Sequence, residues 1–119
     1  MLKVYAYQGC STCRAALSWL RGKGIPFTEV AIRETPPTLP ELRAMLAAHG
    51  GQFRAIFNTS GLEYRALGLK DKLSAMPVDE ALSLLAANGK LVKRPFALDA
   101  ARGVHLVGFR EAEWLAALG

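Results

Sequence analysis

The stretch that decides the fold runs Leu2-Lys3-Val4-Tyr5-Ala6-Tyr7-Gln8-Gly9-Cys10-Ser11-Thr12-Cys13. Its first half, Leu2 to Tyr7, is typical of a β-strand, and the apolar spacing over Cys13–Lys23 predicts a helix that stops at Gly24. The following segment, Ile25–Ile32, predicts a second strand. A strand, a crossover helix and a strand within about thirty residues form a βαβ unit, so the two strands are expected to lie parallel in one sheet.

The two cysteines of the chain, Cys10 and Cys13, form a C-x-x-C motif at the junction of the first strand and its helix. A helix N-terminus has unpaired N–H groups and a positive dipole end, which favour the thiolate form of a nearby cysteine. Open α/β sheets also place their sites at this end of the strands. We therefore expect Cys10 to be the catalytic nucleophile and Cys13 the resolving thiol, the two forming a redox disulfide.

Two other interpretations of the motif stay open. A C-x-x-C pair can supply half of a zinc site, but zinc needs two further ligands, and His49 and His105 show no paired spacing. The pair can also be two unreactive buried thiols, because free cysteine is among the most buried residue types. The position between strand and helix favours redox chemistry and no bound metal.

Composition predicts one compact domain over residues 1–119, with 51% hydrophobic and 21% charged residues. The sequence predicts no membrane span and no secretory signal, so a cytoplasmic protein is the default expectation. The net charge of +5 allows an anionic partner. Because the basic residues are spread along the chain, direct nucleic-acid binding is not expected.

The remaining sequence predicts two further regions after a βαβ region over residues 1–34. Residues 35–90 predict a helical insert, and residues 91–119 predict two strands and a closing helix, the thioredoxin-type order. The first expected helix is capped by Thr38 with Glu41 and ends near His49. The second is capped at Asn58-Thr59-Ser60 and ends near Leu67. The other two expected helices are Val78–Ala87 and Arg110–Leu118. The expected strands of the last region are Phe96–Asp99 and Val104–Gly108.

Three runs resemble the ArsC/Spx family: Gly9 to Ala16 with Trp19-Leu20 after it, Leu91 to Pro95, and Val107 to Phe109. That family contains glutaredoxin-coupled arsenate reductases, Spx-type transcriptional regulators and reductase-like proteins of unassigned substrate. The resemblance covers nearly the whole chain. It implies an α/β, thioredoxin-like (glutaredoxin-like) fold with a mixed four-stranded sheet and a helical insertion.

The resemblance also implies roles for particular residues. The reactive cysteine of the family corresponds to Cys10, and its Arg-Pro pair corresponds to Arg94-Pro95, where a cis proline is implied. Arg94 would offer a fork of donors to an anion held at Cys10, and neighbouring Arg14 would help to activate the thiol. The full set expected to bind substrate or anion is Ser11, Thr12, Arg14, Arg94 and Pro95, with the backbone N–H groups of the loop forming a cradle.

Arsenate reductases of this type use two further arginines, which fall near Asn58 and Gly108 in this chain. Each missing arginine removes charge-assisted hydrogen bonds of about 1.5–3 kcal/mol. The departure argues against arsenate as the substrate. The arsenate reductases commonly carry serine at the position of Cys13, whereas Spx-like and several unassigned members have the C-x-x-C found here.

These observations predict an ArsC-like thiol-disulfide reductase, coupled to glutathione as co-substrate and acting on a disulfide, glutathionyl or oxyanion substrate. Its electron donors would be glutathione or a glutaredoxin or thioredoxin system, and a monomer is expected. The alternative is an Spx-like redox-sensing regulator that binds the C-terminal domain of the RNA polymerase α subunit. A third possibility is a catalytically lapsed domain that holds a partner through Lys90, Lys93 and Arg94.

Overall fold

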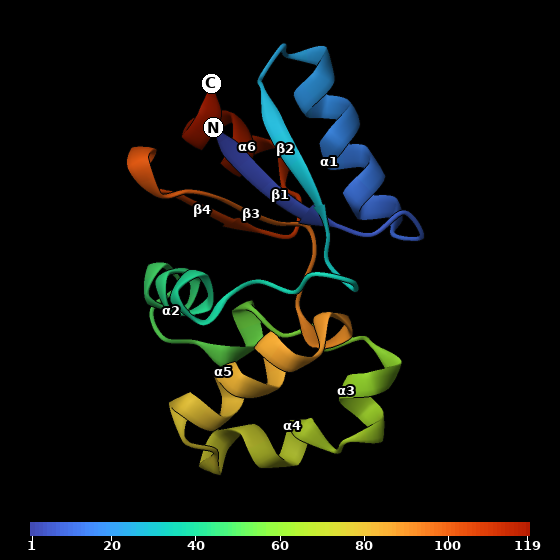
Figure 1. The fold of residues 1–119 in the computed structure, drawn as a ribbon, viewed down its shortest axis with the longest axis vertical. Helices are drawn as coiled ribbons and strands as arrows, with labels where there is room; N and C mark the ends of the chain where they lie inside the picture. Colours follow the sequence, from blue (N-terminus) through green and yellow to red (C-terminus); the bar gives the residue numbers. More distant parts are fainter. The chain divides into compact units, whose positions relative to one another are not determined.

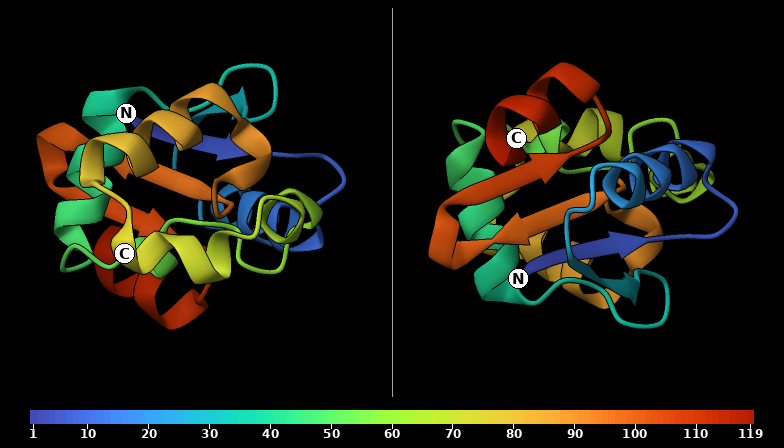
Figure 2. Two further views of the ribbon diagram at one scale, coloured as in Figure 1. Left: turned by 90° about the horizontal axis from the view of Figure 1, so that it is seen from below. Right: turned by 90° about the horizontal axis from the view of Figure 1, so that it is seen from above.

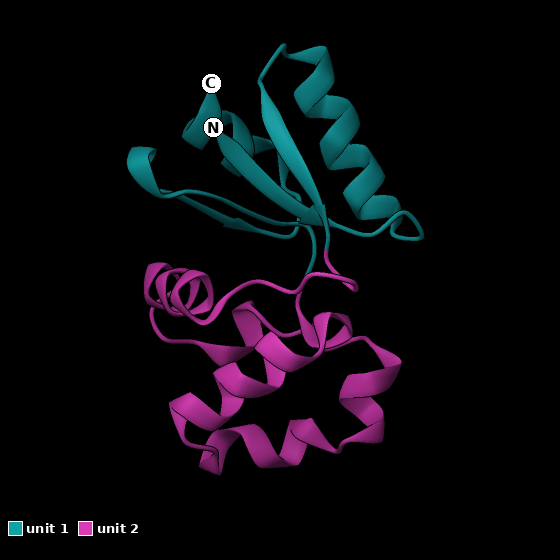
Figure 3. Ribbon diagram, in the orientation of Figure 1, with its two compact units in different colours: residues 1–31, 94–119 teal, residues 32–93 magenta.

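The computed structural model describes all residues 1–119, and the chain divides into two compact units (Figure 3). Unit 1 combines both ends of the chain, residues 1–31 and 94–119, and unit 2 is the intervening segment Ile32–Lys93. The residues expected to form a helical insert, 35–90, lie within unit 2. None of the helices combines the length and the hydrophobicity that a transmembrane span requires.

Unit 1 is built on a mixed four-stranded sheet of order β2-β1-β3-β4 (Figure 1). Its strands are β1 (Leu2–Ala6), β2 (Phe27–Ala31), β3 (Phe96–Asp99) and β4 (Val104–Val107). β1 pairs parallel with β2, whereas the β1–β3 and β3–β4 pairs are antiparallel. The parallel pair joined by a helix and the later hairpin confirm the α/β thioredoxin-like arrangement predicted from the sequence.

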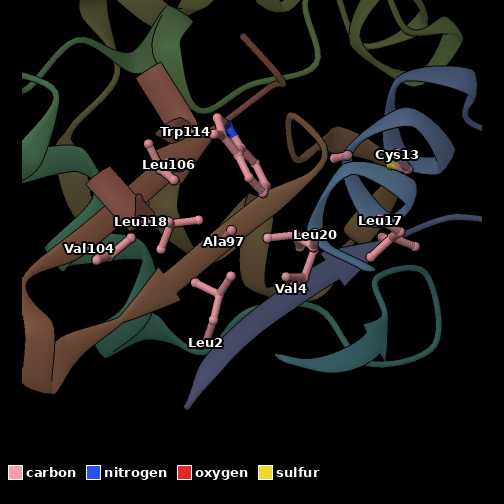
Figure 4. Close-up of a cluster of buried hydrophobic side chains, with 12 residues drawn as sticks. Leu2, Val4, Cys13, Leu17, Leu20, Ala97, Val104, Leu106, Trp114 and Leu118 are labelled. Atoms are coloured by element: carbon pink, nitrogen blue, oxygen red, sulfur yellow. The ribbon is translucent and has the colours of Figure 1, made fainter. Parts of the chain in front are cut away.

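Helices α1 (Ser11–Gly22) and α6 (Glu111–Leu118) cover the same face of this sheet, as the right-hand view of Figure 2 shows. The side chains between helices and sheet form one apolar cluster, most of which Figure 4 labels: Leu2, Val4, Ala6, Cys13, Ala16, Leu17, Leu20, Ala97, Val104, Leu106, Trp114 and Leu118. Trp114 is fully buried, and its indole N–H donates to the Gly108 carbonyl at 3.0 Å. Burial of each large side chain stabilises the unit by about 1.5–3 kcal/mol.

Helix α1 begins two residues earlier than the apolar spacing predicted, at Ser11 instead of Cys13. Cys10 is its N-cap, with extended backbone dihedral angles, and the Cys10 side chain accepts a hydrogen bond from the Cys13 N–H. Sulfur is not among the usual capping groups, which are the oxygens of Ser, Thr, Asp and Asn. The periodicity therefore missed the true start of the helix.

Unit 2 is helical, with α2 (Leu39–Ala48), α3 (Leu62–Ala66), α4 (Leu69–Lys72) and α5 (Val78–Ala87), and short 3₁₀ turns follow α2, α4 and α5. The capping box of Thr38 with Glu41 is confirmed, and so are the bounds of α5. The predicted cap at Asn58-Thr59-Ser60 is wrong, because α3 begins after Gly61. Asn58 instead donates its backbone N–H to the Leu91 carbonyl at 2.7 Å, beside a bridge between Phe57 and Val92.

Helix α4 was not predicted. It follows Gly68, which has a left-handed backbone with φ of 64° and separates α3 from α4. Glycine adopts this conformation without steric cost, so two short helices can follow one another at an angle. A sequence pattern of four residues is too short to show helical periodicity.

Candidate redox site of unit 1

The loop between β1 and α1 holds Cys10 at the carboxyl end of β1. The Cys10 N–H donates to the Tyr7 carbonyl at 3.1 Å, and the Arg14 N–H donates to the Cys10 carbonyl at 3.1 Å. These two bonds connect the turn to the first turn of α1. The Cys10 thiol is half-buried, and Cys13, one helical turn further on, is fully buried; both are free thiols.

The surroundings of Cys10 favour its thiolate. Partial burial raises the pKa of Cys10, but hydrogen bonds from the Cys13 thiol and the Cys13 N–H, and then the Arg94 guanidinium, outweigh it. The net effect places the pKa of Cys10 below its ordinary value. The Cys13 N–H lies 3.3 Å from Cys10 Sγ, at the positive end of α1. A thiolate held in this way is a ready nucleophile.

Cys13 is held in the opposite protonation state. Burial, together with its hydrogen bond to Cys10 and the charge of the Cys10 thiolate, raises the pKa of Cys13 to about 12. The protonated Cys13 thiol therefore donates its hydrogen to Cys10. The two sulfurs are therefore hydrogen-bond donor and acceptor, with the pKa of Cys10 lowered and that of Cys13 raised, as the predicted nucleophile and resolving thiol would require.

Arg94 is the cation that acts on Cys10, and it comes from the segment just before β3. The Arg94–Pro95 peptide bond is cis, as the resemblance implied. The guanidinium carbon of Arg94 lies 5.3 Å from the centre of the Tyr7 ring, and its Nε is buried without a hydrogen-bond partner. Arg94 acts on the Cys10 thiol through a hydrogen bond and its charge, so an anion bound at Cys10 would lie within reach of a guanidinium.

The remaining predicted site residues lie on the first turn of α1. Ser11 and Thr12 are exposed there, and their backbone N–H groups belong to the orphan donors of the helix N-terminus. Arg14 is exposed too, but its guanidinium donates to the Gln8 carbonyl at 2.5 Å. The guanidinium that lowers the pKa of Cys10 belongs to Arg94, where the sequence had pointed to Arg14.

Two residues of the site were not singled out from the sequence. The Tyr7 ring packs beside Gly9 so closely that a Cβ on Gly9 would lie 2.4 Å from Tyr7 Cε2. The same ring carries Arg94 on its face. Tyr7 thus connects the loop backbone to the cation that stabilises the thiolate. The available signal in the sequence was an aromatic residue three positions before Cys10, Tyr7, and a glycine one position before it, Gly9.

The two positions where arsenate reductases carry further arginines have backbone roles here. Gly108 has a left-handed backbone with φ of 68°, and its N–H donates to the Pro95 carbonyl at 2.9 Å. Asn58 pairs with Leu91 in unit 2. Neither offers a cation. No group of three or more His, Cys, Asp or Glu side chains gathers where it would hold a metal ion.

Comparison with known proteins places the chain in a family. The model of the ArsC family matches residues 5–117. YusI of Bacillus subtilis is 43% identical, covering 95% of this chain and 94% of its own length. The global transcriptional regulator Spx of Enterococcus faecalis is 33% identical, covering 95% of this chain and 83% of its own.

Solved structures agree with this assignment. A possible arsenate reductase from Streptococcus mutans has a TM-score of 0.88 and 41% identity, covering 98% of both chains. An ArsC family related protein from Bacteroides fragilis has a TM-score of 0.89 and 40% identity, covering 98% of this chain and 96% of its own. With the C-x-x-C loop, the cis Arg94–Pro95 bond and the mixed sheet, these matches show that the chain belongs to the ArsC family.

Proposed function

We propose that the protein is a thiol-disulfide reductase that uses Cys10 as nucleophile. The observation that carries the proposal is the lowered pKa of Cys10, which results from the Cys13 donors and Arg94. The Cys10 thiolate attacks one sulfur of a disulfide or glutathionyl substrate. A Cys10 mixed disulfide forms, the substrate S–S bond breaks, and the other sulfur leaves as a thiolate. With an oxyanion substrate the Cys10 thiolate would instead form a bond to the central atom and displace one of its oxygens, which leaves as hydroxide or, once protonated, as water, while Arg94 balances the charge of the remaining oxygens.

The second step releases the substrate half. Once Cys10 is in a mixed disulfide, its negative charge and its hydrogen bond to Cys13 are lost, and both of these raised the pKa of Cys13. Cys13 then ionises more easily and attacks Cys10, forming the Cys10–Cys13 disulfide and expelling the bound thiol as a thiolate. Two molecules of glutathione, or a glutaredoxin or thioredoxin, would reduce this disulfide and be oxidised in turn.

A glutathione-coupled disulfide reduction assay of two single variants tests this assignment. Cys10→Ser is expected to abolish turnover. Cys13→Ser keeps the nucleophile, so it is expected to retain turnover resolved by glutathione itself and to accumulate a Cys10–glutathione adduct visible by mass spectrometry. Full activity of Cys10→Ser would refute the assignment of Cys10 as the nucleophile. Equal loss of activity in both variants would show that turnover requires the Cys10–Cys13 disulfide.

A regulator is the second candidate, supported by the similarity to the Spx protein of Enterococcus faecalis over 95% of this chain. In that function the Cys10–Cys13 disulfide would change affinity for the C-terminal domain of the RNA polymerase α subunit. The change in affinity is measured by the binding of the reduced and the oxidised protein to that isolated domain. Equal affinity of the two forms, or no binding, would remove this candidate.

We place either activity in the cytoplasm, in a monomer that needs neither a membrane nor direct contact with nucleic acid. Titration against defined ratios of reduced and oxidised glutathione, with thiols trapped by alkylation, shows which oxidised form of Cys10 dominates. A dominant Cys10–Cys13 disulfide favours a switch or dithiol couple. A dominant Cys10–glutathione adduct favours the reductase.

A further inference from the structure

A pocket lies within unit 2, among residues that the redox chemistry does not use. Its volume is about 270 Å³, close to that of the smallest ligand pockets. The side chains that line it are Arg54, Thr59, Tyr64 and Lys70. Arg54 comes from the 3₁₀ turn Phe53–Ala55, Tyr64 from α3 and Lys70 from α4 (Figure 1). Polar side chains from several elements therefore meet around one pocket.

The packing of unit 2 holds this lining in place. Tyr64 is only 5% exposed, and its ring packs against the Phe57 ring with centroids 6.2 Å apart. The Thr59 N–H donates to the Phe57 carbonyl at 3.0 Å. Gly68, with its left-handed backbone, turns the chain between Tyr64 and Lys70. The pocket is therefore formed before any ligand binds, as small-molecule sites usually are.

The charges at the pocket have one sign. Arg54 and Lys70 are exposed cations, and neither forms an ion pair within the chain. Glu63, a carboxylate of the same segment, is paired with Lys90, whose Nζ lies 4.0 Å from Glu63 Oε1. Asp71, the other carboxylate of this segment, lies outside the lining. An anion in the pocket would meet two cations without displacing an internal ion pair.

The hydroxyl groups of Thr59 and Tyr64 add further donors. The Tyr64 hydroxyl has no hydrogen-bond partner in the chain and is not among the buried unpartnered atoms, so it is accessible from the pocket. A guanidinium, an ammonium and two hydroxyl groups offer more donors than a carboxylate can accept. A phosphate monoester has three terminal oxygens and a charge of about −1.5 to −2 at pH 7. The lining therefore suits a phosphate monoester better than a carboxylate.

We infer that this pocket binds a small phosphate monoester, with Arg54 and Lys70 on the phosphoryl oxygens and the Tyr64 hydroxyl as a further donor. The organic part of the ester is small, because the pocket volume is about 270 Å³. All the lining residues belong to unit 2, so the inference does not depend on the redox function proposed for unit 1. Binding here makes and breaks no covalent bond.

The test is a titration of the ¹⁵N-labelled full chain with phenyl phosphate and with inorganic phosphate, at about 0.15 M salt, followed by two-dimensional NMR. The backbone amide signals of Thr59, Tyr64 and Lys70 are expected to shift to saturation with phenyl phosphate, and at higher concentration with inorganic phosphate. Arg54→Gln and Lys70→Gln should each raise the dissociation constant about five- to tenfold, because each removes charge-assisted hydrogen bonds. Tyr64→Phe keeps the ring and should raise it about threefold.

Arg65→Gln is the matched control, since it removes the same charge from an exposed residue of α3 outside the lining. It is expected to leave the dissociation constant unchanged, and an equal rise in this variant would overturn the pocket in favour of a general charge effect. The amides of Ser11 and Thr12 report an anion at the redox site. Shifts confined to those two amides would overturn the inference and leave the reductase intact.

The two probes also separate the two sources of a phosphoryl group. Tighter binding of phenyl phosphate supports an ester, whereas equal dissociation constants for both probes would overturn the ester and assign the pocket to free phosphate. The same spectra show whether each variant is folded. Lys70→Gln changes an exposed side chain, so it keeps the inference open to refutation even if Arg54→Gln does not fold.

Discussion

At the scale of single residues, the pKa of Cys10 decides whether unit 1 is a redox centre. A pKa below the ordinary value means that the thiolate persists to lower pH than in a free cysteine, and only the thiolate is alkylated. The alkylation rate of Cys10 by iodoacetamide should therefore reach half its maximum below about pH 8.5, where an unperturbed thiol does. The rate should fall as the pH drops through the pKa of Cys10.

Arg94→Gln is expected to raise the pH at which the alkylation rate of Cys10 is half its maximum (the alkylation midpoint), because the substitution removes a hydrogen bond and a positive charge from the thiolate. At neutral pH the alkylation of Cys10 should become several-fold slower. Arg110→Gln, an exposed arginine on another part of unit 1, serves as the control of equal charge. An equal shift in both variants would show a general charge effect and contradict the contact between Arg94 and Cys10.

Tyr7 and Gly9 give a second prediction at this scale. Gly9→Ala should displace the Tyr7 ring, since the new Cβ would meet it at 2.4 Å, and so loosen Arg94 from Cys10. Tyr7→Leu should act in the same direction by removing a cation–π contact of about 0.5–2 kcal/mol. In both variants the alkylation midpoint of Cys10 rises.

A double variant makes this prediction specific. With Tyr7→Leu present, Gly9→Ala should add little, because residues in contact are coupled and their effects do not sum. Gly22→Ala is the matched control, since a Cβ there meets nothing within 4 Å. Additive shifts from Tyr7→Leu and Gly9→Ala would mean that the two residues act on Cys10 independently.

At the scale of elements, the parts predicted well are those whose signals are local. The helix Val78–Ala87 and the strand Phe96–Asp99 have the bounds that their patterns gave. α1 starts earlier than its apolar pattern predicts, because the Cys10 thiol caps it. The predicted cap at Asn58 is wrong because the backbone N–H of Asn58 pairs with the carbonyl of Leu91, which is distant in the sequence. Local patterns carry no information about such long-range pairing.

The site divides in the same way. Cys10 and Cys13 came from their motif, but the approach of Arg94 to Cys10 joins distant parts of the chain and came only through resemblance. The contact of Arg94 with Tyr7 depends on the pairing of β3 with β1, which brings the two segments together. Those placements follow from packing in three dimensions, which sequence spacing does not specify.

The capping box of α2 gives a prediction about stability. Thr38 Oγ1 accepts from the Glu41 N–H at 3.4 Å, and Glu41 Oε1 accepts from the Thr38 N–H at 2.9 Å. Thr38→Ala removes the first bond, so it should lower the free energy of unfolding by about 1 kcal/mol in urea denaturation. Thr35→Ala, just outside the helix, should stay within about 0.5 kcal/mol of the parent. Equal effects would refute the cap.

At the scale of the whole molecule, the site is made entirely by unit 1, from both ends of the chain. The cysteine loop lies in residues 1–31 and Arg94 with its cis proline in residues 94–119, and β1 pairs with β3 to join the two segments. The site therefore depends on the folding of the sheet as a whole. A loop that binds a metal or a nucleotide through local sequence alone would not need this pairing of two distant segments.

The net charge of +5 acts on the same scale, because it surrounds the thiolate with a field that attracts anions. Raising the ionic strength from about 10 mM to about 0.5 M shortens the screening length from about 30 Å to under about 5 Å. Glutathione disulfide is anionic, so its reaction rate with Cys10 should fall at least about threefold over this range.

Hydroxyethyl disulfide, which carries no charge, is expected to react at a nearly constant rate over the same range, and stopped mixtures analysed by mass spectrometry give both rates. If both rates fall together, salt acts on the Cys10 thiolate and not on the approach of the substrate. If neither falls, the positive charges are too dispersed to steer an anion, and recognition would lie in contacts made after encounter.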